Sequence, residues 1–195
     1  PSALLEEVNK FILNHCDEAY LVGGCVRDRL LGRESRDFDF AVKEGGLSLA
    51  REVANRVKGS FVVLDDERDT GRVVFWDKTG HPFYVDIARL RETSIIEDLR
   101  GRDFTVNAIA VKAEDWDKSP LPLIDPLGGQ EDINRRIIRA VSRNSFRDDP
   151  VRLVRAIRFS ASLGFTIEEN TLQWLRQDAY LIQGASAERV RDELC

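Results

Sequence analysis

Two glycines near the start of the chain have the residue type and spacing for phosphate chemistry. Gly23 and Gly24 follow the apolar pair Leu21–Val22, and because neither glycine has a Cβ, the backbone there can approach a ligand closely. Residues 26–31 have helical spacing, so the glycines are predicted at the N-terminus of a helix that carries Arg27. Free N–H groups and the helix dipole favour a phosphate at that position. The segment therefore predicts a phosphate-binding turn.

Two aspartates follow at a short distance. Asp37 and Asp39 lie in the alternating segment 37–42, which is typical of a strand, and period two places both on one face with Phe38 and Phe40 on the other. Neighbouring carboxylates repel each other, and a hard cation such as Mg²⁺ removes that penalty while binding phosphate oxygens. The pair is therefore predicted to bind Mg²⁺, and its combination with the glycine turn indicates nucleotidyl transfer.

Each feature is common by itself, and a surface strand or a tight turn would explain either one alone. The Gly–Lys–Ser/Thr of a Walker loop does not follow the glycines, and the GxGxxG dinucleotide pattern is absent. The order of strand, glycine pair, basic helix and Asp-x-Asp strand favours nucleotidyl transfer over the simpler interpretation.

Five segments spread along the chain occur in a recognisable order. They are residues 21–32 with 37–39, 101–108, 125–133, 148–159 and 187–190. Together they resemble the five motifs of the class II tRNA nucleotidyltransferase and bacterial poly(A) polymerase family. The resemblance implies an α+β fold, with a polymerase β-like, mixed-sheet nucleotidyltransferase head at residues 1–141 and an all-helical neck at residues 142–195.

Hydrophobic periodicity agrees with a mixed sheet followed by helices. Helices are predicted at 4–12 and 47–57, strands at 61–64, 72–76, 83–87 and 109–112, and a loop at 113–122. Asp86 lies on a strand predicted to pair beside the Asp-x-Asp strand. The resemblance implies that Asp86 is a third catalytic acid, which helps to activate the attacking hydroxyl, and an exposed strand acid is the alternative.

The second motif contains a basic, an acidic and an amide side chain close to the predicted start of one helix. Asp103 is predicted to cap that helix. The resemblance implies that Arg102, Asp103 and Asn107 contact the sugar and phosphates of the incoming nucleotide. Gly101 stands where the family usually has a further arginine.

The fourth motif repeats charged residues every third position. Asp149, Arg152, Arg155 and Arg158 are predicted to line one drifting face of a helix, and by spacing alone a salt-bridged surface helix would explain them. The resemblance implies instead that Asp149 and Arg152 read the base of the nucleotide. Arg155 and Arg158 are expected to order the helix or to meet phosphates.

The connection at residues 91–103 lacks the long insert that CCA-adding family members carry there. In the family that insert is associated with switching the pocket from CTP to ATP. The resemblance therefore implies a CC-adding enzyme, in which the 3′-hydroxyl of a tRNA lacking CCA attacks the α-phosphate of CTP with Mg²⁺. A separate A-adding enzyme would then act in sequence.

Several other functions stay open at this point. CCA addition, A-addition alone and poly(A) synthesis would all use ATP. From a different class, the chain could be an inactive RNA-binding module with this fold, although such a module has no use for the repulsion between Asp37 and Asp39.

Composition and charge limit the possible partners and location of the protein. The net charge of -5 argues against general nucleic-acid binding, yet residues 135–158 hold eight arginines, a local region suited to phosphates. The sequence has no membrane-length apolar run and no secretory signal, and its three cysteines lack paired spacing, so a cytoplasmic location is expected. Because the chain begins at Pro1 and stops within a helical pattern, we expect a piece truncated before further helical body and tail parts.

Overall fold

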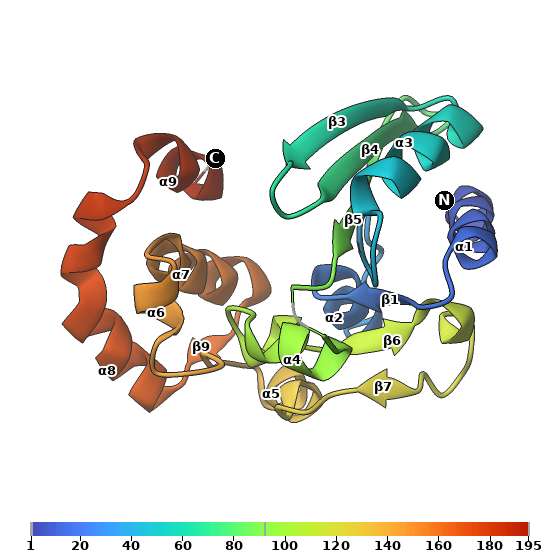
Figure 1. Ribbon diagram of the computed structural model, residues 1–195. Helices are drawn as coiled ribbons and strands as arrows, with labels where there is room; N and C mark the ends of the chain where they lie inside the picture. The colour runs from blue at the N-terminus through green and yellow to red at the C-terminus, as the bar shows by residue number, and fades with distance from the viewer. Residues whose placement is uncertain (1, 92, 195) are drawn as a thin grey trace. The chain divides into compact units, whose positions relative to one another are not determined.

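The structure is a computed structural model that describes residues 2–91 and 93–194 (Figure 1). Contacts divide the chain into two compact units. The sheet unit runs up to Leu99 and includes Ile109–Ile124, and the helical unit consists of Arg100–Ala108 and the chain from Asp125 onward. The predicted α+β class is confirmed. A boundary between head and neck at residues 141/142 stays a prediction.

A mixed seven-stranded sheet forms the centre of the sheet unit, with strand order β3-β4-β5-β2-β1-β6-β7. Strands β2 and β5 pair in parallel, and the remaining neighbours are antiparallel. The parallel pair confirms that the strand of Asp86 lies beside the Asp-x-Asp strand. In chain order the strands are β1 (Ala19–Val22), β2 (Asp37–Val42), β3 (Ser60–Asp65), β4 (Thr70–Trp76), β5 (Pro82–Arg89), β6 (Ala110–Lys112) and β7 (Leu123–Ile124).

The two faces of strands β2, β4 and β5 differ in burial. One face is buried, and it includes Val73, Phe75, Phe83, Val85 and Ile87. Helix α3 (Gly46–Val57) lies along this face next to β4 (Figure 1), and a Cβ built on Gly71 would come within 2.8 Å of the Ala50 Cβ. The alternate residues on the opposite face are half-buried or exposed, except Ala41 of β2, which is buried. We call this second side of β2, β4 and β5 the open face.

The remaining helices are divided between the two units. The sheet unit contains α1 (Ser2–His15), α2 (Gly24–Leu30) and the 3-10 helix η2 (Ala113–Asp115), and α4 (Ile95–Arg100) leads into the helical unit. The helical unit contains η1 (Thr105–Asn107), α5 (Gly129–Arg135), α6 (Ser145–Asp148), α7 (Val151–Leu163), α8 (Glu169–Asp178), η3 (Ala179–Gly184) and α9 (Ala187–Leu194).

The segment after residue 142 is mainly helical, as predicted, with one departure. Strand β9 (Thr166–Ile167) pairs in parallel with β8 (Ile137–Ile138), because the Thr166 amide donates to the Arg136 carbonyl oxygen at 2.9 Å. The expectation of an all-helical neck is therefore wrong at β9. Among the described residues, no helix is both long enough and apolar enough to cross a bilayer.

An aromatic cluster connects the second motif to α7 inside the helical unit. The Phe104 ring is fully buried, and its centroid lies 5.9 Å from that of Phe159 and 6.5 Å from that of Phe146. Helix α7 ends at Gly164, which adopts a left-handed conformation with φ of 70°. This packing holds the polar residues that flank Phe104 next to the start of α7.

Candidate active site

The acid residues gather in one row on the open face. Asp39 of β2 pairs with Asp86 of β5, which in turn pairs with Arg72 of β4. Directly paired residues in a sheet point to the same side, so these side chains share the open face with Asp37, two residues along β2. Phe38 is buried on the opposite side, as the alternation predicted.

Arg72 is the functional candidate that the sequence pattern did not single out. Its guanidinium donates from Nε to Asp86 Oδ1 at 2.7 Å and from Nη2 to Asp86 Oδ2 at 2.8 Å. These hydrogen bonds raise the pKa of Arg72, and the charges of Asp37 and Asp39 add to the shift. Only the antiparallel register of β4 and β5 could have located it, because Arg72 lies far from the glycine turn in the sequence.

The electrostatics of Asp37 fit a cation site. Loss of surrounding water raises the pKa of the Asp37 carboxyl, and the carboxylates of Asp86 and Asp28 raise it further, while Arg72 opposes the shift. Three carboxylates therefore surround one guanidinium on the open face, which leaves an excess of negative charge. A bound cation would remove this excess.

The donor set suits a hard cation bound by few protein ligands. Over residues 2–91 and 93–194, no group of three or more His, Cys, Asp or Glu side chains is arranged to hold a metal. Mg²⁺, however, is commonly bound through one or two carboxylates and completes its shell with water and substrate phosphates. Asp37 and Asp39 could supply those two carboxylates, because Asp86 is occupied by Arg72.

The glycine turn begins beside this acid row. Val22, the last residue of β1, pairs with Asp39, and Gly23 follows at once with φ of 73° and ψ of -127°, a conformation that favours glycine. Gly24 has no such requirement, and a Cβ built there would meet only the Arg27 guanidinium, at 3.6 Å. Among the described residues, no clash requires a glycine at position 24, so the space beside this backbone is open.

Arg27 lies in the first turns of α2. Its side chain is largely buried and forms an ion pair with Asp28 at 2.8 Å. The guanidinium next to Gly24 places a positive charge at the turn. The turn and its arginine therefore have the backbone freedom and the charge that a phosphate group requires.

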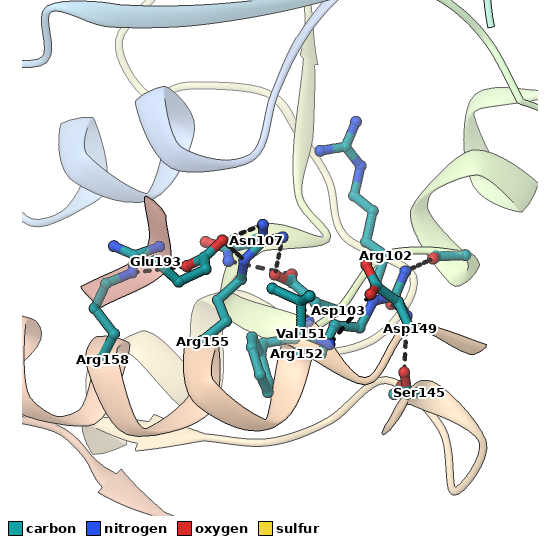
Figure 2. Close-up of polar contacts among 12 residues, drawn as sticks. Arg102, Asp103, Asn107, Ser145, Asp149, Val151, Arg152, Arg155, Arg158 and Glu193 are labelled. Carbon is teal, nitrogen blue, oxygen red and sulfur yellow. Dashed lines mark hydrogen bonds and ion pairs between the residues drawn. The ribbon is translucent and has the colours of Figure 1, made fainter. Parts of the chain in front are cut away.

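The second motif lies in the helical unit, where Asp103 is buried and fully engaged. Its Oδ1 accepts from the Phe104 amide at 2.7 Å and from Asn107 Nδ2 at 3.2 Å, and its Oδ2 accepts from Arg155 at 3.3 Å. The expected helix cap is wrong, because Phe104 occupies the position before η1 and no side chain caps that helix. Asp103 instead fixes the orientation of Asn107 and Arg155 (Figure 2).

Asp149 lies two residues before Val151, where α7 begins, so the predicted helical ladder starts too early. Its φ of -151° and ψ of 102° are extended, and Pro150 separates it from Val151, the first helical residue. Asp149 Oδ1 accepts from the Val151 amide at 3.2 Å and Oδ2 accepts from Arg189 at 2.7 Å. Burial alone would raise the pKa of Asp149, but hydrogen bonds from Arg189 and Val151 outweigh it and lower that pKa.

Arg152 is buried and bound to main-chain oxygens. Its guanidinium donates to the carbonyl oxygens of Gly101 at 2.9 Å, Arg102 at 3.3 Å and Ser145 at 3.4 Å. The side chain thereby joins the second motif to α7, while the Arg102 side chain extends away from that helix (Figure 2).

Glu193 of α9 connects the other two arginines of α7. Arg155 Nε donates to Glu193 at 2.7 Å, and Arg158 Nε donates to the second oxygen at 2.9 Å (Figure 2). Sequence reasoning missed Glu193 altogether, and it recorded Arg189 only as part of the fifth motif without a role. Their helical spacing, with Arg189 and Glu193 four residues apart on α9, is the signal that could have suggested a shared face.

Two family descriptions match successive parts of the chain. Residues 19–139 match the family described as Poly A polymerase head domain, and residues 164–195 match the family described as Probable RNA and SrmB-binding site of polymerase A. The chain therefore belongs to the class II tRNA nucleotidyltransferase and poly(A) polymerase family, which confirms the resemblance seen in the motifs.

Individual relatives carry more specific names. A CC-adding tRNA nucleotidyltransferase of Geobacter sulfurreducens is 47% identical over 176 residues, which are 90% of this chain and 39% of that protein. An A-adding tRNA nucleotidyltransferase of Deinococcus radiodurans is 42% identical over 181 residues, or 90% of this chain and 39% of that protein. The chain thus spans about two fifths of the length of these curated relatives.

A solved structure extends the similarity to the fold. The Thermotoga maritima CCA-adding enzyme, complexed with tRNA-CCA, superposes with a TM-score of 0.81 at 36% identity and covers 98% of this chain and 45% of that one. The similarity supports the predicted nucleotidyltransferase head.

Proposed function

We propose that the chain is the catalytic and nucleotide-binding part of a metal-dependent tRNA nucleotidyltransferase, and that this enzyme adds cytidines to the 3′ end of tRNA. One observation carries the proposal. The glycine turn follows β1, Asp39 lies on β2 and Asp86 lies on β5, and these three strands are neighbours in the sheet. Membership of a family that is generally metal-dependent supports it.

The reaction is an in-line displacement at phosphorus. The RNA O3′ forms a bond to the α-phosphorus of CTP, the bond from that phosphorus to the α–β bridging oxygen breaks, and pyrophosphate leaves. Mg²⁺ held by Asp37 and Asp39 would neutralise charge on the phosphate oxygens when bound. Asp86 accepts the hydroxyl proton, since each of its oxygens keeps a second lone pair while Arg72 orients the carboxylate.

The remaining site residues bind the nucleotide. Gly23, Gly24 and Arg27 hold the triphosphate through backbone N–H groups and one guanidinium. Arg102, Asp103 and Asn107 meet the sugar and phosphates, and Asp149 with Arg152 reads the base. The buried hydrogen bonds around Asp103 and Arg152 support this assignment, because a base-reading group must be held in one orientation to discriminate.

We further propose that addition stops after two cytidines. Residues 90–94 connect β5 directly to α4, and the Arg91 amide donates to Asp98 of α4 at 3.2 Å, so a compact helix occupies the place expected for an insert. Glu92 within this connection lies outside the described residues. A separate A-adding enzyme would then complete the tRNA.

The test is incubation of the full-length protein with tRNA that lacks its CCA end and with each labelled nucleoside triphosphate separately. We expect two cytidines to be added with Mg²⁺, and no AMP to be added to tRNA that ends in CC. Efficient AMP addition to that tRNA would overturn the CC-specific proposal in favour of CCA or A addition. Repeated AMP addition without CTP use would indicate a poly(A) polymerase, and no incorporation at all would indicate an RNA-binding module.

A further inference from the structure

The open face carries aromatic side chains immediately next to the acid row. Tyr84 of β5 pairs on one side with Asp37 and on the other with Val74. Trp76 follows two residues further along β4, opposite Pro82, and more than half of its surface, 55%, is exposed. Paired residues lie about 5 Å apart, and alternate residues on one strand lie about 7 Å apart. Tyr84 is therefore the direct neighbour of the carboxylates, and Trp76 lies further along the same face.

The sheet order puts these rings on the opposite side of β2 from the glycine turn. The turn follows β1, which flanks β2 on one side, and Tyr84 and Trp76 belong to β5 and β4 on the other. In an in-line displacement the attacking and leaving oxygens lie on opposite sides of the phosphorus. If the triphosphate occupies the β1 side, the attacking RNA end approaches from the side of β5 and β4.

The chemistry of this part of the open face suits single-stranded nucleic acid. The Arg72 guanidinium lies 5.2 Å from the centre of the Tyr84 ring and is fixed there by Asp86. Lys78, in the turn after Trp76, adds an exposed positive side chain at the same end. Arg36, just before β2, does not contribute to this face, because its guanidinium lies 4.9 Å from the centre of the Phe83 ring and pairs with Asp77 at 3.0 Å. Exposed rings that stack on bases, beside cations that meet the backbone, are the usual means of binding unpaired nucleotides.

We propose that Trp76 and Tyr84 form a stacking platform for the unpaired 3′-terminal nucleotides of the RNA substrate. This inference rests on the proposed function, because it assigns the RNA side of that reaction. The platform holds the terminal ribose beside Asp86, on the opposite side of β2 from the glycine turn. Arg72 is a positioning residue that orients both Asp86 and the Tyr84 ring.

The experiment compares full-length wild-type protein with Trp76→Ala and Trp76→Phe, using tRNA that lacks CCA. Val63→Ala is the matched control, since Val63 is also apolar and about half exposed, but its partner Gly71 belongs to the buried face. We expect Trp76→Ala to raise the KM for tRNA on the order of tenfold with little change in the KM for CTP. Trp76→Phe should retain most of the affinity for tRNA, and Val63→Ala should behave as wild type.

A direct readout does not depend on turnover. RNA with 5-iodocytidine at its 3′ terminus should crosslink to Trp76 or Tyr84 on irradiation, and the crosslinked peptide is identified by mass spectrometry. Failure of the wild type to incorporate CMP would count against the proposed function. If CMP incorporation is normal but Trp76→Ala leaves the KM for tRNA unchanged and the crosslinks fall elsewhere, the platform alone is overturned. A change in oligomeric state in Trp76→Ala would also overturn it, because the rings would then contact a protein partner.

Discussion

On the open face of the sheet, three carboxylates lie around the guanidinium of Arg72, and burial, together with the carboxylates of Asp86 and Asp28, raises the pKa of Asp37. In the helical unit the charges are matched. Asp149 has Arg189, Asp103 has Arg155, and Glu193 joins Arg155 to Arg158. A bound cation would balance the charge of the first arrangement, whereas the charges of the second are already paired with one another.

This difference indicates what each region does in the proposed reaction. An excess of like charge costs stability, and proteins retain it where a ligand or a reaction uses it. A network with satisfied partners holds its side chains in one geometry, which is what discrimination between bases requires. Changes on the open face should therefore alter the rate of the chemical step, and changes in the helical unit should alter the choice of nucleotide.

The largest effect is expected for Asp39→Ala, with Asp37→Ala close to it. Loss of a metal ligand removes several kcal/mol of transition-state stabilisation, so CMP incorporation should fall by about a thousandfold or more. The thermal unfolding midpoint should not decrease, because removing one of several repelling carboxylates relieves a native-state cost.

The control for this change is Asp66→Ala, which removes a carboxylate from the exposed turn between β3 and β4. It should keep full activity. Incorporation near the wild-type rate in Asp39→Ala would remove the acid row from the mechanism and end the contrast between the two regions.

The acidic residues of the open face could be predicted from the sequence, because strand alternation depends only on residues that are close together in the chain. Period two placed Asp37 and Asp39 on one face, and the alternating segment 83–87 placed Asp86 on a strand, which is β5 in the structure. Arg72 was missed because its partner is set by register between strands, and the sequence shows no pattern for that pairing.

The helical unit was harder to predict from the sequence for two physical reasons. Glu193 reaches Arg155 from 38 residues away, and such long-range ion pairs leave no periodic signal. Asp149 was placed on the helix by its spacing, although a residue before proline is disfavoured in helical conformation. Its extended backbone follows from Pro150, so this error was avoidable from the sequence alone.

An intermediate effect is expected for Gly24→Val, which tests the glycine turn of the sheet unit. The added side chain would occupy the space through which the backbone N–H groups reach the triphosphate. Affinities for CTP and ATP should both fall about 10- to 100-fold, as expected for loss of charge-assisted hydrogen bonds. Equilibrium nucleotide binding without RNA measures both, and Gly184→Val, where an added Cβ meets open space, is the control. Unchanged affinity would place the triphosphate elsewhere.

The smallest and most selective effect is expected for Asp149→Ala in the helical unit. A site that discriminates by hydrogen bonding rejects a wrong base by leaving polar groups unpaired, so loss of this carboxylate should reduce the preference for CTP over the other nucleotides about tenfold. Competition between labelled nucleoside triphosphates measures the preference directly. Asp148→Ala removes the same charge from an exposed neighbour and should leave the preference intact. A uniform loss of rate with unchanged preference would mean that Asp149 only anchors Arg189, and the helical unit would then be a scaffold instead of the reader of the base.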